Sequence, residues 1–187
     1  MSKNINDDIE KVLISEKEID EIAKGLAERI NHDYAESRKD LVLVCLLKGS
    51  LMFTSQLMRY ITLPVEVEFM KVSSYGSGTK TSGIISIQLD IKRTDLGNVD
   101  ILIVEDIIDS GRTLTKLMPL FREKGANSVK TCAMLDKPSR REVEFKPDYC
   151  GRIIPDEFVV GFGLDYGEKY RNLPYVGVLK PAVYEKH

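Results

Sequence analysis

Residues 101–115 constrain the fold of this chain more than any other stretch, because they combine a buried strand, a polar loop and the start of a helix. Residues 101–104 form an apolar run without alternation, which is typical of a parallel strand covered on both faces. Glu105 and Asp106 follow at once, and the segment from Asp109 onward leads into a helical pattern. In an open α/β sheet, ligands bind at the carboxyl edge of the strands. The sequence therefore predicts an α/β protein with a ligand site in this loop.

The loop between this strand and the helix suits a phosphate monoester. Ser110 and Thr113 supply hydroxyl groups, and Gly111 lets the backbone approach a ligand closely. The N–H groups of a helix N-terminus add donors for an anion. A simpler interpretation is that the two acids only solvate the end of the strand and that Asp109 only caps the helix.

From residue 101 to residue 113, the stretch resembles the phosphoribosyl-diphosphate motif of the type I phosphoribosyltransferases. In that motif an apolar strand, two acids and two apolar residues precede Asp-Ser-Gly-Arg-Thr, and the match here is contiguous. The resemblance implies that the loop holds the 5-phosphate of the sugar donor, and that the acid pair reaches ribose hydroxyls that also bind Mg²⁺. The donor-binding residues implied in this way are Glu105, Asp106, Ser110, Gly111, Arg112 and Thr113.

Composition limits the classes of function. The net charge of −2 gives no overall attraction to nucleic acid or to an anionic membrane. Cys45, Cys132 and Cys150 are odd in number, which favours free thiols in a reducing compartment over a disulfide framework. No apolar run approaches the roughly 20 residues of a membrane-spanning helix, and the charged start does not resemble a signal peptide. We therefore expect a cytoplasmic protein with no nucleic-acid or membrane partner.

The pattern along the chain predicts a mostly parallel central sheet of about five strands, flanked by helices. Ser15 and Glu18 form a capping box before an amphipathic helix. Prolines at 147 and 155 and a glycine at 151 predict loops in that part of the chain. The predicted strands are residues 41–47, 65–72, 84–91, 101–104, 128–135 and 175–179, with a short one within 1–14. The predicted helices are 16 to about 37, one that follows residue 50 and runs to 60, and one that ends near 125.

Lys48 and Gly49 follow the strand predicted at residues 41–47 and repeat the central arrangement of strand, loop and helix. A lysine in such a place is most often simply solvated. Residues 46–49, however, resemble the loop that holds the pyrophosphate in purine members of the family, where the peptide before the lysine is often cis. The resemblance therefore implies that Lys48 and Gly49 bind the diphosphate of the donor.

Residues 73–83 contain three glycines, many hydroxyl groups and one aromatic side chain. Such a segment cannot bury enough apolar surface to stay fixed, and on composition alone it is a flexible connection between two strands. Ser74 and Tyr75 resemble the mobile loop that closes over the donor in this family. We therefore expect a flexible active-site lid here.

Two C-terminal segments, residues 135–141 and 156–173, resemble signatures of the hypoxanthine-guanine phosphoribosyltransferases. Taken singly, their residues have plainer interpretations, since a phenylalanine in an apolar run is usually core and an aspartate before Tyr-Gly can be a turn residue. The resemblance implies that Lys137 donates to the purine 6-oxo oxygen, Phe158 stacks on the base, the Val159 backbone meets the base edge, Asp165 engages a second magnesium and Arg171 binds the pyrophosphate.

The expected reaction transfers phosphoribosyl from phosphoribosyl diphosphate to N9 of hypoxanthine or guanine, with Mg²⁺, giving IMP or GMP and pyrophosphate. Asp109 is the candidate general base and Lys137 the second catalytic residue. The alternatives are a xanthine-preferring enzyme, a uracil or adenine branch, or a regulator that only senses the donor. We expect one domain over residues 1–187, with a small hood formed mainly by about 138–187 and the N-terminus as a further candidate. By analogy with the family, we expect a homodimer or homotetramer.

Overall fold

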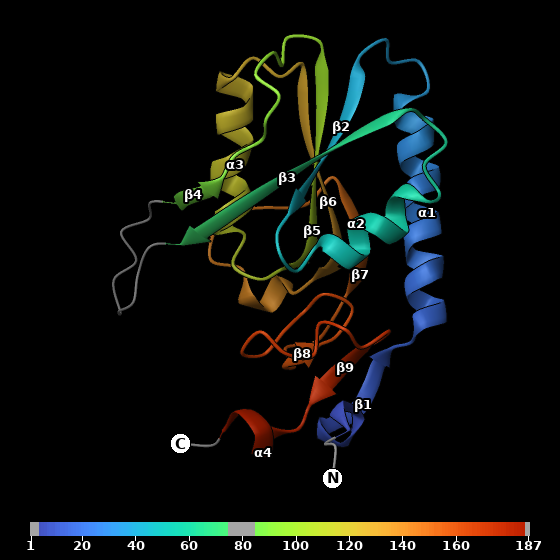
Figure 1. Ribbon diagram of the computed structural model, residues 1–187, viewed down its shortest axis with the longest axis vertical. Helices are drawn as coiled ribbons and strands as arrows, with labels where there is room; N and C mark the ends of the chain where they lie inside the picture. The colour runs from blue at the N-terminus through green and yellow to red at the C-terminus, as the bar shows by residue number, and fades with distance from the viewer. Residues whose placement is uncertain (1–3, 75–84, 186–187) are drawn as a thin grey trace.

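The computed structural model describes residues 4–74 and 85–185, and its largest element is a six-stranded sheet with the strand order β4-β3-β2-β5-β6-β7 (Figure 1). Neighbouring strands from β3 to β7 are parallel, and β4 is antiparallel to β3. This confirms the α/β fold, with five parallel strands and one antiparallel strand at the edge. The strands are β2 (Asp40–Leu46), β3 (Val65–Ser74), β4 (Ile85–Leu89), β5 (Val99–Ile108), β6 (Ser128–Asp136) and β7 (Tyr149–Ile153).

Helices cover both faces of this sheet. Figure 1 shows α1 (Glu16–Tyr34) and α2 (Leu51–Met58) on one side and α3 (Arg112–Glu123) on the other. Alternate side chains of β5 enter two different cores: Leu102 packs with α1 and α2, whereas Ile103 packs with α3. The apolar run without alternation is therefore a strand buried on both faces, as predicted.

The first helix begins where the capping box predicts. Glu18 donates its backbone N–H to the Ser15 hydroxyl over 3.3 Å, and the Glu18 carboxylate accepts from the Ser15 backbone N–H over 2.9 Å. The same carboxylate accepts from Arg152 on β7 over 2.8 Å. One acidic residue thus fixes the helix start and ties it to the edge of the sheet.

A smaller antiparallel sheet lies beyond the carboxyl ends of the parallel strands (Figure 1). Its strand order is β1-β9-β8, so the N-terminal strand pairs with a strand from the C-terminal part of the chain. No helix in the described part of the chain is long and apolar enough to cross a membrane. The remaining elements are β1 (Ile9–Ile14), β8 (Val159–Val160), β9 (Val176–Leu179), α4 (Pro181–Tyr184) and the 3-10 helices η1 (Ile5–Asp8) and η2 (Pro138–Arg140).

Two predictions of local structure were wrong. Residues 149–153 are not a loop but strand β7, which pairs in parallel with β6. Pairing with a neighbouring strand here outweighs the local effect of the glycine and the flanking prolines. The central strand is also longer than predicted, because the ladder to β6 continues from Glu105 to Ile108. Glu105 and Asp106 therefore lie within the last part of β5 and not in the loop after it.

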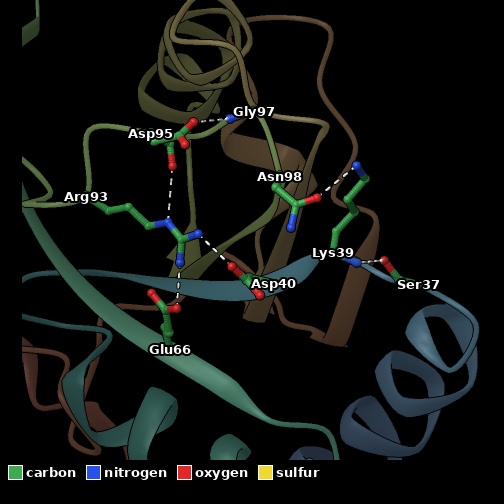
Figure 2. A network of polar contacts seen from close by, with 8 residues as sticks. All are labelled: Ser37, Lys39, Asp40, Glu66, Arg93, Asp95, Gly97 and Asn98. Atoms are coloured by element: carbon green, nitrogen blue, oxygen red, sulfur yellow. Dashed lines mark hydrogen bonds and ion pairs between the residues drawn. The ribbon is translucent and has the colours of Figure 1, made fainter.

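A polar network joins the strands at the opposite, amino edge of the sheet (Figure 2). Arg93, from the connection between β4 and β5, pairs with Asp40 at 2.6 Å and with Glu66 at 2.5 Å. Lys39 donates to the Asn98 side chain over 3.0 Å, which links the start of β2 to the turn before β5. These contacts fasten three strand beginnings together, and the residues of the predicted site lie at the other edge.

Candidate active site

The predicted phosphate loop lies between β5 and α3. Gly111 is the N-cap of α3 and has a φ of 79°, a left-handed conformation that favours glycine. A cavity of about 140 Å³ is lined by Glu105, Ser110, Gly111 and Thr113, among others. The structure therefore brings together the hydroxyls, the glycine and an acid of the motif around a space of phosphate size.

Arg112 differs from the other residues of the motif in where its side chain goes. Its guanidinium pairs with Glu142 at 2.5 Å, while its backbone N–H donates to the Ser110 hydroxyl over 3.3 Å. In this geometry Arg112 holds the Ser110 hydroxyl through its backbone N–H and marks the start of α3.

Arg141 contacts the phosphate loop, a role that its place in the signature of residues 135–141 did not predict. Its guanidinium donates to the Asp109 carbonyl over 2.6 Å and pairs with the Asp136 carboxylate, and only 14% of its side chain is exposed. The neighbouring Arg140 pairs instead with Asp156 near the surface. Two adjacent arginines thus have different roles, and Arg141 fixes the backbone of the phosphate loop.

The acids at the end of β5 share an unfavourable environment for charge. Burial, together with the charge of Asp106, raises the pKa of Glu105 well above its usual value. Burial likewise raises the pKa of Asp106 to about 6, and the nearby Asp165 acts in the same direction while Arg171 opposes it. Asp106, Asp165 and Arg171 are therefore electrostatic neighbours, although Asp165 and Arg171 come from the C-terminal part of the chain.

The loop after β2 contacts these acids closely. The peptide bond between Leu47 and Lys48 is cis. A Cβ atom at Gly49 would lie 1.8 Å from Asp106 Oδ2, so only a residue without a side chain fits there unless the carboxylate moves. A Cβ atom at Gly163 would lie 1.9 Å from the Gly49 carbonyl oxygen. The loop around Gly163 is therefore packed directly against the predicted pyrophosphate loop.

Arg171 is held in place by this C-terminal loop. Its guanidinium donates to the Gly163 carbonyl over 2.7 Å and pairs with Asp165 at 2.9 Å. Lys48 reaches across from the other side and pairs with Glu168 at 2.8 Å. The sequence predicted Lys48, Asp165 and Arg171 as site residues, but it did not predict Glu168 between the two cations.

A larger pocket of about 510 Å³ lies next to the phosphate loop. The Lys137 ammonium at the end of β6 donates to the Glu157 carbonyl over 2.7 Å, and Lys137 is only 7% exposed. Phe158 is 40% exposed, and Val159 beside it is buried. The residues lining the pocket are Asp106, Ile107, Asp109, Lys137, Arg140, Asp156, Glu157, Phe158, Val159, Leu164, Asp165 and Tyr184.

Tyr184 is a further pocket residue that the sequence did not reveal. Its ring stacks on Phe158 with centroids 4.7 Å apart and an interplanar angle of 18°. Tyr166 meets Phe158 edge-on at 5.6 Å. One face of Phe158 is thus covered by the short C-terminal helix α4.

Asp109 lines both the small cavity and the large pocket. It therefore lies between the predicted phosphate loop and the predicted purine pocket.

Of the two residues predicted for the lid, Ser74 is the last residue of β3, and Tyr75 lies outside the described residues.

Comparison with known proteins identifies the class. A family model for the phosphoribosyl transferase domain matches residues 8–167, from the end of η1 to the loop that carries Asp165. The chain belongs to the phosphoribosyltransferase family.

Within this family, the similarity is to enzymes of one branch and extends over the whole chain. The chain is 55% identical over 186 residues to the hypoxanthine-guanine phosphoribosyltransferase of Lactococcus lactis, with 100% of both chains covered. It is 51% identical over 178 residues to that of Bacillus subtilis, covering 95% of this chain and 97% of the other. A crystal structure of a hypoxanthine phosphoribosyltransferase from Staphylococcus aureus superposes with a TM-score of 0.92 at 44% identity, covering 98% of both chains. The resemblance found in the sequence motifs is confirmed.

Proposed function

We propose that the chain is a purine-salvage enzyme that transfers the 5-phosphoribosyl group of phosphoribosyl diphosphate to N9 of hypoxanthine and guanine. The products are IMP or GMP and pyrophosphate. The observation that carries this proposal is the position of Asp109, which lines both a phosphate-sized cavity and a pocket large enough for a purine. The names of the full-length relatives support the same reaction.

The donor binds along the ends of β5 and β2. Ser110, Gly111 and Thr113 line the small cavity and hold the 5-phosphate with hydroxyl and backbone donors. Arg112, which the motif also implies for donor binding, lies at the start of α3 and orients the Ser110 hydroxyl through its backbone N–H. The diphosphate extends toward Lys48 and Gly49 on the neighbouring loop, where Arg171 supplies a second positive charge.

The base binds in the larger pocket, where Lys137 selects for an oxygen at position 6. An ammonium group only donates hydrogen bonds, so it matches the 6-oxo acceptor of hypoxanthine and guanine and mismatches the 6-amino group of adenine. The Phe158 side chain is partly exposed and stacks on the base, and the backbone at Val159 meets the base edge. The pocket therefore suits a 6-oxopurine.

Asp109 acts as the general base. It accepts the proton from N7 of the base while N9 attacks C1 of the ribose, and the bond from C1 to the pyrophosphate oxygen breaks with oxocarbenium character on the sugar. Lys48 and Arg171 stabilise the negative charge that develops on the leaving pyrophosphate. Arg141 donates a hydrogen bond to the Asp109 carbonyl, and this contact keeps the backbone of the general base in place.

Magnesium is the metal that the family implies, and the acids at the end of β5 fit it. Carboxylates are hard oxygen ligands, and Mg²⁺ is usually held by one or two of them with substrate oxygens and water. The pKa values of Glu105 and Asp106 are raised because their surroundings disfavour the charged forms, and a bound cation would stabilise those charged forms. Among the described residues, no group of three or more His, Cys, Asp or Glu side chains could hold a metal by itself. Glu105 and Asp106 would hold one ion with the ribose hydroxyls and Asp165 a second with the pyrophosphate, and bound Mg²⁺ would neutralise charge on the leaving group.

The segment that contains Ser74 and Tyr75 is proposed to close over the bound donor. Water competes with the purine for the sugar cation, so an enzyme of this kind gains from a loop that excludes solvent during the reaction. The composition of residues 73–83 supports this role.

We also propose that the chain is one domain that assembles as a homodimer or homotetramer in the cytoplasm. Three exposed apolar side chains, Phe69, Ile87 and Leu89, lie on the neighbouring strands β3 and β4 at the edge of the main sheet. Contiguous exposed apolar side chains mark surfaces that contact another subunit, and we propose that this edge of the sheet is such a surface. The free thiols of Cys45, Cys132 and Cys150 suit a reducing compartment.

The direct test of the proposed reaction offers phosphoribosyl diphosphate and magnesium with hypoxanthine, guanine, xanthine, adenine and uracil in separate assays. We expect nucleotide and pyrophosphate from the 6-oxopurines, with hypoxanthine and guanine preferred. A preference for xanthine would change the assigned substrate but not the class. Folded protein that binds the donor but turns over none of the five bases would contradict the proposal.

A further inference from the structure

The two cations assigned to pyrophosphate already have an anionic partner in this chain. Lys48 Nζ lies 2.8 Å from Glu168 Oε2, although the two residues are 120 positions apart in the sequence. The same carboxylate oxygen lies 3.4 Å from Arg171 Nη2. One carboxylate oxygen therefore contacts both positive groups, and it does so from the C-terminal loop that packs on the pyrophosphate loop.

The backbone brings Glu168 to this position. Glu168 has a φ of 65°, in the left-handed region, and its backbone N–H donates to Asp165 Oδ2 over 2.9 Å. Close packing of Gly163 on Gly49 sets the two loops against each other. Glu168 is thus directed to Lys48 by the fold of its own loop.

The ion pair to Lys48 is easily exchanged, whereas Arg171 is held more firmly. The Lys48 side chain is 52% exposed and that of Glu168 is 64% exposed, so solvent screens their attraction. Arg171 is 25% exposed and has the Gly163 carbonyl and Asp165 as further partners. Its Nε is buried without a hydrogen-bond partner in the part of the chain that the structure describes. An incoming anion can therefore replace Glu168 at Lys48 without removing Arg171 from its place.

We propose that Glu168 is a positioning residue that acts as an internal counter-anion: it pairs with Lys48 and Arg171 in the ligand-free enzyme and gives way to pyrophosphate. This inference rests on the proposed function, which places the leaving group at these two cations. Binding of pyrophosphate must break the Glu168 pair, and release of pyrophosphate restores it. Glu168 thereby lowers the affinity for this product and favours its release.

The test compares the affinity for magnesium pyrophosphate of the wild-type enzyme and the Glu168→Gln variant by isothermal titration calorimetry. Glutamine keeps the shape of the side chain and removes its charge. Because solvent screens an exposed ion pair, the gain should be modest, and we expect roughly two- to five-fold tighter binding in the variant. The matched control is Glu36→Gln, because Glu36 is an exposed acid beyond the end of α1, away from this loop. We expect this control to bind pyrophosphate as the wild type does.

A second comparison isolates the contact with Lys48. In a Lys48→Met background, Glu168→Gln should produce a smaller gain in affinity than in the wild-type background, because the main partner of Glu168 is gone. Hypoxanthine affinity should not follow the pyrophosphate change, since Glu168 does not line the purine pocket. A general loosening of the structure would alter both affinities.

Unchanged or weaker pyrophosphate binding in Glu168→Gln overturns the inference. Weaker binding would mean that Glu168 holds Lys48 in its productive position and does not compete with the product. The proposed function fails separately, because it is judged by turnover of the wild type with purine bases, whereas this inference is judged by pyrophosphate binding alone.

Discussion

Replacing Gly49 by alanine should damage donor binding in a way that follows from one distance. The new Cβ would lie 1.8 Å from Asp106 Oδ2 and 2.6 Å from its Cγ. To reach ordinary contact distance the carboxylate has to retreat by roughly 1.5 Å, or the loop after β2 has to move outward by a similar amount. Either movement separates groups that are proposed to hold the ribose hydroxyls and the diphosphate.

A displacement of about 1 Å in a catalytic arrangement can cost on the order of 100-fold in rate. We therefore expect kcat/KM for phosphoribosyl diphosphate to fall about 100-fold in Gly49→Ala, which is roughly 2.7 kcal/mol of transition-state stabilisation. The assay measures initial rates of IMP formation with varied donor at saturating hypoxanthine.

The matched control is Gly25→Ala in α1, where a Cβ atom would meet nothing within 4 Å. Alanine in a helix interior is more favourable than glycine by about 0.5–1 kcal/mol, so this control should unfold at a higher temperature and keep its kinetics. A donor kcat/KM of Gly49→Ala within two-fold of the wild type would show that Asp106 can leave its position without loss of donor use.

Two further predictions concern the pocket and the acid stability of the fold. Tyr184→Ala should raise KM for hypoxanthine about two- to ten-fold, because an aromatic pair contributes roughly 0.5–1.5 kcal/mol and Phe158 loses its stacked ring. Tyr184→Phe keeps the ring and should keep KM; equal KM in all three proteins would remove Tyr184 from the pocket. The hydrogen bond from Arg152, with those of Ser15, lowers the pKa of Glu18 to about 2. Since this pKa is lower in the folded state than in the unfolded state, Glu18 stabilises the fold above its usual pKa of 4.5, and that contribution is lost as the pH falls toward 2. Urea unfolding of Glu18→Gln between pH 5 and pH 2 should show a shallower loss of stability than the wild type, and parallel curves would contradict the assignment.

The contiguous motifs were the part of the site that could be predicted from the sequence. The strand of residues 101–104, the acid pair and the loop from Ser110 to Thr113 are adjacent in the chain, so local patterns suffice to place them on one strand and one helix start. Lys48 and Lys137 were placed correctly at strand ends for the same reason. The extent of β5 was underestimated, because the ladder with β6 decides where the strand ends.

The contacts that complete the site come from distant segments, and no local pattern encodes them. Arg141 and Arg140 are adjacent and chemically alike, yet only the packed structure directs Arg141 to the Asp109 carbonyl. Glu168 meets Lys48 across 120 positions of sequence, and Tyr184 reaches Phe158 from the short helix α4. Strand β7 was missed because its pairing with β6 outweighs the weak strand signal of its own residues.

Asp109, between the two pockets, is proposed to be the general base of the transfer. The most direct measurement is the single-turnover rate of IMP formation by Asp109→Asn, together with calorimetric binding of phosphoribosyl diphosphate to the same variant. We predict a rate lower by about 10²- to 10⁴-fold, as expected for loss of a general base, with little change in donor affinity. An unchanged rate in this chemistry-limited step would show that Asp109 does not take the proton, and the assignment of the base would have to move to another group of the pocket.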